Sequence, residues 1–590
     1  MLLLVALLLA AATDLTATSC VSLPRTGPVR ARTVDGAGAG DTLVDYTPAG
    51  PRAGSGPVPL VDNWLTSMTA TPLNTYVARE FLTTASSTSW VPERGTLAYG
   101  SQQLVAGPGG VVLLRLRDVV SLDARGAWQG DPTSGRGVDY RLRLVKEDGQ
   151  WRISDPPNRL LVPRSHLDTQ YEQFRLYFFD RSGQVLVPEP VYVPRGRQAP
   201  TVLLAGLLKG PEPGLDDVER TFFPPGTALD GISVPVTRSG TADVPLGDRV
   251  LDVDSARLKL VFAQMAWTLG QVPGVQRLRV TVNGAPLDPP GVSADVNVDD
   301  FSEYDPSVAW AATDLFGVRD RRVVTDDSQG EGRVSGPFGV LPVGPRSIAV
   351  DPLAQHIAAV TPDGRRVLES DRDGVSGRAA RPSDIRTLYA GGTDLLRPAY
   401  DMYGQLWCVD RTRSGARLLV ARGGVSRPVD VLGVTGARVS RFLVSRDGTR
   451  LVAELRRAGI DQLVTARVRR DLQGGVVGAT RARRLHLEGL PGRIQDIAWR
   501  TPTDLAVLVA PSPGSSEVLL AKVDGSSTAA ELGTDAALFR GRVVRLVSSP
   551  STGTPLYVAT STGRLYALSA RGRWKASTVK PGLGAPTFVG

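Results

Sequence analysis

Short apolar segments recur through residues 336–590 at a nearly constant spacing, each followed by turn-forming residues such as Asp363-Gly364 or Asp447-Gly448. Periods of about 40 to 50 residues with several strands per period are typical of β-propeller blades. We therefore predict a propeller-like domain here, with five visible modules and a sixth using the strands around residues 321–340. The modules are marked by residues that lie 51, 43, 55 and 49 positions apart: Ile348, Ala399, Phe442, Ile497 and Leu546.

The whole chain has 590 residues, well beyond the roughly 250 to 300 at which single hydrophobic cores stop growing. The hydrophobic fraction of 42% is too high for a disordered chain, so we predict several globular domains. Two cysteines exclude a disulfide scaffold, a cysteine-ligated zinc site and an iron–sulfur cluster, and three histidines leave little for a metal site. We expect no metal and no bound cofactor.

The first residues indicate a signal peptide over 1–19. The apolar run 1–12 is far shorter than the roughly 20 residues that cross a bilayer. Ala17-Thr18-Ser19-Cys20 resembles the lipobox of bacterial lipoproteins, although Ala17 stands where Leu is favoured and no basic residue precedes the run. The resemblance implies that Cys20 carries a diacylglyceryl group and an N-acyl group as a membrane anchor. An ordinary signal peptide or a buried helix remains the alternative, and 20–59 reads as a flexible tether.

Residues 60–196 show an α+β pattern. Helical spacing around 60–68 and 76–82 places Trp64, Val77 and Phe81 on one apolar stripe. Strands are expected at 111–120, 138–144, 151–153, 174–179 and 185–187, the last two joined by a hairpin turn at 181–183. Two helices followed by a curved antiparallel sheet resemble a cystatin-like or NTF2-like cone.

A second α+β unit is predicted over 197–300. A helix over 202–208 ends at Gly210-Pro211, and an edge strand is expected at 232–236 because it contains Pro235. Asp254 or Ser255 can cap a second helix, whose core stripe is Leu258, Val261, Phe262, Met265 and Leu269, with Trp267 also expected in the core.

Four strings in this unit resemble the GerMN domain of spore-germination lipoproteins. They are 207–211, 223–227, 263–269 and 280–284, the last ending in the turn Asn283-Gly284. The family's known members carry no established catalytic residues, so the resemblance assigns none here. Residues 301–335 are interpreted as a linker to the propeller.

No residue pattern indicates catalysis, and we expect no enzyme activity. Asp363 and Asp447 are explained by turn geometry, and Cys408 lies in a strand-like run that suggests a buried apolar role. The histidines, His166, His356 and His486, have no ligand spacing. The motifs G-x-S-x-G, H-E-x-x-H and the P-loop are absent from the sequence.

The formal charge is +9, and arginines gather between Arg456 and Arg484. This run has no interleaved aromatics, so we expect no nucleic-acid partner and interpret the arginines as solvated loops and strand edges. An anionic surface, phospholipid or wall polymer, is a weaker alternative. Trp407, Trp499 and Trp574 are candidate glycan contacts, the first two more simply explained as core.

Domain order and the GerMN-like strings together resemble the LpqB family of actinobacterial lipoproteins, which accompany the MtrB sensor kinase and the MtrA response regulator. This resemblance implies an anchored extracytoplasmic protein that binds the extracytoplasmic domain of an MtrB-like sensor histidine kinase. Because arginine is enriched in interface hot spots, arginine-bearing propeller loops such as 411–422 are the first candidates for contact. Composition and periodicity leave another class open, an envelope protein that binds glycan or peptidoglycan, and less favourably a propeller hydrolase.

Overall fold

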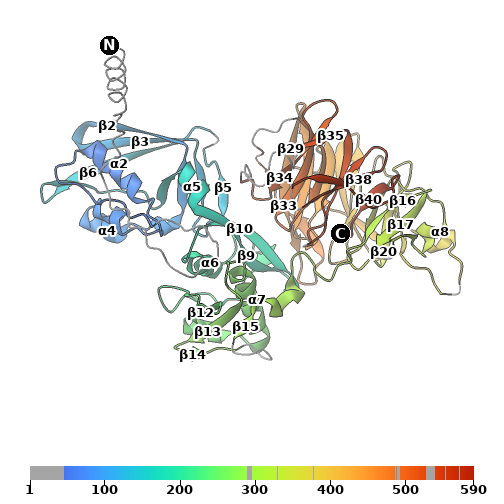
Figure 1. Ribbon diagram of the computed structural model, residues 1–590, viewed down its shortest axis with the longest axis horizontal. Coiled ribbons are helices and arrows are strands. Elements are labelled where there is room, and N and C mark those ends of the chain that lie inside the picture. Colours follow the sequence, from blue (N-terminus) through green and yellow to red (C-terminus); the bar gives the residue numbers. More distant parts are fainter. Residues whose placement is uncertain are drawn as a thin grey trace, which may run out of the picture. The chain divides into compact units, whose positions relative to one another are not determined.

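The computed structural model describes residues 45–590 apart from 134, 289–294, 328–329, 377, 486, 488–491, 527–537, 552 and 570–571. Cys20, the predicted signal peptide and most of the predicted tether therefore lie outside the described residues. The chain divides into two compact units (Figure 1). Among the described residues, the first comprises 45–90 together with 104–114 and 141–156, and the second comprises the remainder.

The first unit is built on three helices, α2 (Pro57–Ser67), α3 (Tyr76–Glu80) and α4 (Thr84–Ser89). The predicted stripe is confirmed, since Trp64 and Phe81 are fully buried and Val77 is nearly so. Trp64 packs against Trp90 with ring centroids 6.1 Å apart. Proline at the first turn of α2 suits a helix start, where its missing N–H would have no partner.

Two four-stranded sheets follow the helices. One has the order β2-β3-β6-β7, and the other has the order β5-β4-β1-β8, in which β1 and β8 are parallel. The single strand predicted over 111–120 is wrong, because Asp118 has a φ of 52° and breaks it into β3 and β4, which join different sheets. The bounds are β1 Thr96–Tyr99, β2 Ser101–Ala106, β3 Val111–Arg117, β4 Val120–Leu122, β5 Trp128–Gly130, β6 Val138–Glu147, β7 Gln150–Ile153 and β8 Leu160–Pro163.

After the short helix α5 (Arg164–Gln170), strands β9 (Tyr171–Asp180) and β10 (Leu186–Pro194) form the predicted hairpin. This hairpin was expected in the N-terminal domain, over 60–196. In the structure it shares one hydrophobic core with helices α6 (Ala199–Leu208) and α7 (Ser255–Leu269), so the predicted boundary at 196 divides residues that pack together.

Helix α7 forms as its sequence predicts. The Asp254 side chain caps it by accepting a hydrogen bond from the backbone N–H of Arg257 at 2.8 Å, and the residues of the predicted stripe are all buried. Around α7 lie β11 (Glu219–Arg220), which pairs with β9, and a sheet of β12 (Thr241–Leu246), β13 (Arg277–Val282), β14 (Ala285–Pro286) and β15 (Val296–Asn297). Asn283 and Gly284, both with positive φ, form the predicted turn.

The edge strand expected at 232–236 is wrong. Ile232 is 98% exposed, and only Val236 makes an isolated bridge, to Ala242. The local reason is that Gly231 precedes the alternating residues and Pro235 lies among them. Pro235 has no N–H to donate, although its carbonyl accepts from the N–H of Asp243 at 2.9 Å.

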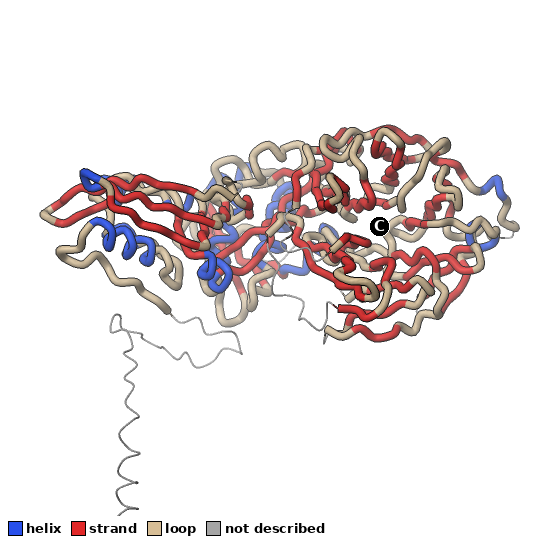
Figure 2. Tube along the Cα trace, turned by 90° about the horizontal axis from the view of Figure 1, so that it is seen from above, coloured by secondary structure: helices blue, strands red, loops and turns tan. Residues whose placement is uncertain are grey.

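The remaining strands form six four- or five-stranded antiparallel sheets arranged as propeller blades (Figures 1 and 2). The first contains β16 (Leu315–Arg319), β17 (Arg322–Asp327), β18 (Gly330–Arg333) and β40 (Gly584–Thr587); the second contains β19 (Ser347–Val350), β20 (His356–Val360), β21 (Val367–Asp371) and β22 (Arg386–Tyr389); the third contains β23 (Ala399–Tyr400), β24 (Leu406–Thr412), β25 (Gly415–Arg422) and β26 (Val425–Pro428). The fourth contains β27 (Val439–Val444), β28 (Arg450–Arg457), β29 (Ile460–Arg470), β30 (Val476–Ala479) and β31 (Arg483–Arg484); the fifth contains β32 (Arg493–Trp499), β33 (Asp504–Ala510), β34 (Ser515–Lys522) and β35 (Leu538–Arg540); the sixth contains β36 (Val543–Val547), β37 (Tyr557–Thr560), β38 (Leu565–Leu568) and β39 (Trp574–Ala576).

The predicted repeat is confirmed, because its five marker residues lie on the first strands of five blades, β19, β23, β27, β32 and β36. These strands contact one another around the propeller axis and are therefore the inner strands. The inner strand of the remaining blade is β40, from the end of the chain, which pairs with β16. The linker interpretation of 301–335 is thus wrong for residues 315–333, which form three strands of the first blade.

Candidate functional site

The residues singled out in the sequence do not come together as a catalytic group. Cys20 and His486 lie outside the described residues. Asp363 and Asp447 lie in turns of different blades, where each accepts hydrogen bonds from its own turn, for example from the N–H of Arg365 at 3.1 Å and of Thr449 at 2.8 Å. In the part of the chain that the structure describes, no three His, Cys, Asp or Glu residues are grouped to hold a metal ion.

The thiol and the two described histidines are also separate. Cys408 is buried in β24, and burial raises the pKa of its thiol to about 12, so it is an unreactive apolar residue as predicted. His166 packs against Tyr171, and burial lowers its pKa. His356 contacts the carboxylate of Asp351 at 3.3 Å.

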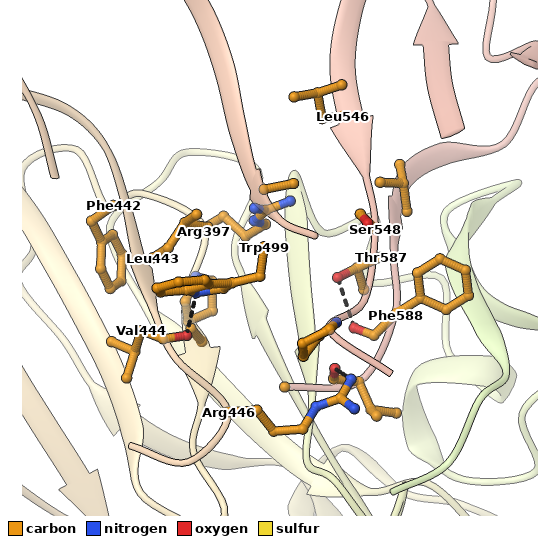
Figure 3. Close-up of a pocket in the computed structure, with 17 residues that line it drawn as sticks. Arg397, Phe442, Leu443, Val444, Arg446, Trp499, Leu546, Ser548, Thr587 and Phe588 are labelled. Atoms are coloured by element: carbon orange, nitrogen blue, oxygen red, sulfur yellow. Dashed lines mark hydrogen bonds between the residues drawn. The ribbon is translucent and has the colours of Figure 1, made fainter. Parts of the chain in front are cut away.

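The propeller axis holds a small cavity of about 50 Å³ between the inner strands and the chain's last residues (Figure 3). Trp499 lies in this cavity and donates its indole N–H to the carbonyl of Val444 at 2.9 Å. Both Trp407 and Trp499 are buried, as predicted, so neither offers a free face to a sugar.

Arg446 closes one end of this cavity. Its guanidinium donates to the carbonyls of Ser307 at 3.0 Å and Val589 at 2.8 Å, and to the hydroxyl of Ser549 at 2.8 Å. Burial lowers the pKa of Arg446 to about 10. One arginine thereby attaches the C-terminal residues to two other segments of the propeller.

Within the part of the chain that the structure describes, buried charges gather at the contact between the GerMN-like region and the fourth blade. We define the buried charge cluster as Glu189 on β10, Glu219 on β11, Arg450 on β28 and Arg467 on β29. Arg450 Nη2 lies 2.7 Å from Glu189 Oε1, and Arg467 Nη2 lies 3.0 Å from Glu219 Oε2. Arg467 also pairs with Glu189. None of these side chains is more than 13% exposed.

The two carboxylates of the cluster differ in their proton affinity. Burial, and then the neighbouring charge of Glu189, raise the pKa of Glu219 to about 8. Burial also opposes ionisation of Glu189, but the guanidinia of Arg467 and Arg450 outweigh it and lower its pKa. Two carboxylates in one buried site resist carrying two charges, so burial and the charge of Glu189 favour the protonated form of Glu219.

Polar contacts extend the same interface along β9 and β10. Tyr403 donates its hydroxyl to Asp180 at 2.8 Å, and Arg175 donates to the hydroxyl of Thr503 at 2.9 Å. The hydroxyl of Tyr192 donates to Ser526 at 2.5 Å. The hairpin β9–β10 thus contacts several propeller blades.

The arginine run was interpreted as solvated, and this is wrong for two of its members. Arg467 belongs to the buried charge cluster, and Arg470 is 2% exposed and paired with Asp401 at 2.5 Å. By contrast, Arg481, Arg483 and Arg484 are exposed. Apolar residues alternate with Arg467 along β29, so the sequence indicates that Arg467 lies on the opposite face of the strand from them. The neighbouring sequence gives no sign that a second domain covers that face.

Three family descriptions match successive parts of the chain. Residues 50–168 match the N-terminal domain of lipoprotein LpqB, residues 175–288 match a domain described as sporulation and spore germination, and residues 321–588 match the LpqB beta-propeller domain. Similar curated proteins include Lipoprotein LpqB of Thermobifida fusca, 27% identical with 94% of each chain covered. Lipoprotein LpqB of Mycobacterium bovis is 28% identical, with 96% of this chain and 95% of that protein covered.

Among solved structures, the first GerMN domain of GerM from Bacillus subtilis covers 22% of this chain and 99% of its own, at 19% identity and a TM-score of 0.19. A chain of a nidogen/laminin complex covers 47% of this chain and 98% of its own, at 13% identity and a TM-score of 0.34.

Among the described residues, no helix is both long enough and apolar enough to cross a membrane. The three matches follow one another in the order of the N-terminal sheets, the hairpin with α6 and α7, and the blades. The relatives align along nearly their whole length. The chain is therefore a member of the LpqB family of envelope lipoproteins, built from an N-terminal domain, a GerMN domain and a β-propeller.

Proposed function

We propose that this protein is anchored through Cys20 at the extracytoplasmic face of the cell membrane. There it binds the extracytoplasmic domain of an MtrB-like sensor histidine kinase and modulates its signalling to cell division and the envelope. The proposal rests on membership of the LpqB family and on one structural observation. The GerMN domain and the propeller are joined by the buried charge cluster, so that together they offer one extended surface to a partner.

Binding from the same membrane would help such contacts. Two proteins held in one membrane meet at a high effective concentration, so a modest intrinsic affinity is sufficient for occupancy. An interface of standard size covers about 1,600 Å² in total, which a propeller and its loops readily accommodate.

The third blade supplies candidate contact residues. The segment 411–422, expected to be a loop, is instead mostly the hairpin of β24 and β25. Arg413, Arg417 and Arg422 on this hairpin are exposed, whereas Arg411 pairs with Asp394. Arginine is enriched in the residues that dominate interface energies, so we assign the first contact tests to these three.

Calorimetric titration of the soluble chain, residues 45–590, against the purified sensor domain tests this proposal. We expect saturable binding at tens of micromolar or tighter. Replacing Arg413, Arg417 and Arg422 together by Glu should weaken it about tenfold or more. Arg540→Glu, at an exposed position on β35, is the matched control and should bind as the unchanged chain does.

Two results would count against the assignment. No saturable binding to the sensor domain, combined with saturable binding to peptidoglycan fragments, would favour a glycan-binding envelope lipoprotein. Equal weakening by Arg540→Glu would show that net charge rather than this hairpin governs binding.

A further inference from the structure

A second, larger cavity of about 280 Å³ opens on the propeller axis. On three inner strands its lining residues come just before those of the cavity in Figure 3, and Arg397 and Phe442 line both. The two cavities therefore follow one another along the axis. We call the larger one the basic mouth; it is lined by Leu396, Arg397, Arg411, Ser440, Arg441, Phe442, Gln495, Asp496, Ile497, Val544 and Arg545.

Four arginines from different strands and loops converge on the basic mouth, and two of them already have partners. Arg411 pairs with Asp394. Arg441 lies 2.6 Å from a carboxylate oxygen of Glu454 and 3.5 Å from one of Asp496. These contacts leave the other two arginines as the available cations.

The side chains of Arg545 and Arg397 make no hydrogen bond or ion pair with any residue that the structure describes. The Nη1 atom of Arg545 is shielded from solvent and has no partner there. Burial, and then the charge of Arg397, lower the pKa of Arg545. A guanidinium nitrogen that is shielded from solvent and has no acceptor is costly, and an anion in the mouth would remove that cost.

Asp496, the acidic residue that lines the mouth, forms no ion pair with Arg397 or Arg545 because both of its carboxylate oxygens have other partners. One carboxylate oxygen of Asp496 accepts the backbone N–H of Leu546 at 2.8 Å, and the other faces Arg441. Ser440 adds a hydroxyl to the lining, and the side-chain carbonyl oxygen of Gln495 is buried without a partner among the described residues. The mouth thus combines two unpartnered cations with an acceptor that lacks a donor.

We propose that the basic mouth binds a small phosphate monoester that also carries hydroxyl groups, such as a polyol or sugar phosphate. The planar guanidinia of Arg397 and Arg545 present paired N–H donors that match phosphate oxygens, and a ligand hydroxyl would donate to Gln495. The volume is close to the lower limit for small-ligand sites, which suits a ligand of this size.

Titration of the soluble chain with glycerol 3-phosphate, inorganic phosphate, glycerol and malate, at matched ionic strength, tests the ligand class. We expect one saturable site for glycerol 3-phosphate and weaker binding of inorganic phosphate, with no binding of glycerol. Absence of saturable binding by both phosphates would overturn the proposal. Tighter binding of malate than of glycerol 3-phosphate would overturn the assignment to a phosphate.

Binding measurements on single-residue variants test whether glycerol 3-phosphate binds in the basic mouth. Arg545→Met and Arg397→Gln should each weaken glycerol 3-phosphate binding about tenfold or more, because each removes charged hydrogen-bond donors. Arg542→Gln, at an exposed position three residues before Arg545, is the matched control and should leave binding unchanged. Binding unaffected by both Arg545→Met and Arg397→Gln would overturn the site.

Thermal unfolding in phosphate-free buffer separates a binding defect from a folding defect. Arg545→Met should unfold at the same or a higher temperature than the unchanged chain, because it removes an unpartnered buried charge. If Arg545→Met does not fold, Arg397→Gln decides the result by itself.

Discussion

Glu219 is fully buried, and only one of its carboxylate oxygens has a hydrogen-bond partner among the described residues. With a pKa raised to about 8, it keeps its proton in the folded protein at pH values where the unfolded chain has released it. Stability conferred by this proton is therefore present at low pH and is lost as the pH rises from about 4.5 to about 8.

We accordingly predict that Glu219→Gln makes stability less dependent on pH. Between pH 5 and 8 the unchanged chain should lose up to about 1.4 kcal/mol per pH unit from this group, and the variant should lack that slope. Chemical denaturation at several pH values measures it. Glu172→Gln, at an exposed position on β9, should retain the slope of the unchanged chain. The same slope in both variants would contradict the assignment to Glu219.

Trp267 was expected in the GerMN core. It is instead partly buried and packs against the outside of that core. Its ring centroid lies 5.3 Å from that of Tyr177, and its indole N–H donates to the carbonyl of Phe301 at 3.0 Å. We expect Trp267→Ala to lower the free energy of unfolding by about 3 kcal/mol. Trp310→Ala, at a side chain that is 46% exposed, should change it by less than about 0.5 kcal/mol. Equal effects in thermal unfolding would contradict this packing.

At the scale of the element, local sequence patterns were sufficient to predict helices and strands whose buried face is set by residues close together in the sequence. The cap and stripe of α7 and the repeating inner strands are examples, because helical spacing and alternation record which face is buried. The first blade was predicted only in part: β17 and β18 lie within the sixth module expected around 321–340, whereas β16 was interpreted as linker because the turn after it gives no glycine signal. Asp320 and Arg321 turn the chain from β16 to β17, both with positive φ, a conformation usually marked by glycine.

Contacts between residues far apart in the sequence were also not predictable from the sequence. Strand β40 pairs with β16, and Arg467 meets Glu189 and Glu219, across hundreds of residues of intervening chain. Alternation identifies a strand and its buried face, but it contains no information about which distant strand or charge completes the contact.

The closing strand allows a direct test. A chain ending at Gly582 loses Leu583, Phe588 and Val589, which are all buried. We expect a loss of about 5 kcal/mol or more and cleavage of residues 315–333 in limited proteolysis, because the edge of β16 is exposed. A synthetic peptide of residues 583–590 should restore protection. A truncated chain that unfolds as the complete chain does would contradict the role of β40.

At the scale of the whole molecule, the buried charge cluster joins two domains. Arg467→Met leaves Glu189 and Glu219 without one guanidinium and should cost about 3 to 5 kcal/mol. We expect a separate unfolding transition for the GerMN domain and faster proteolysis between the domains. The matched control is Arg469→Met, on the same strand, where the side chain is 41% exposed and lies 4.0 Å from Asp217. If both variants behave alike, the cluster does not hold the domains together.

Membrane attachment is predicted to depend on Cys20. Acyl chains contribute about 0.8 kcal/mol per buried CH₂, so Cys20→Ala should release the protein from membranes or block its maturation. Cys408→Ala, the matched control, should fractionate with membranes as the unchanged chain does. A Cys20→Ala protein that remains with membranes after a high-salt wash would contradict the anchor.

The position of β40 also determines the order of events during synthesis. Since Phe316 pairs with Thr587, the first blade lacks its inner strand until residues 584–587 have been made. The propeller therefore cannot close before β40 has been made, and a chain stalled or cleaved before β40 keeps an open strand edge that favours aggregation or degradation. Synthesis of β40 thus determines which molecules reach a closed, protease-resistant state.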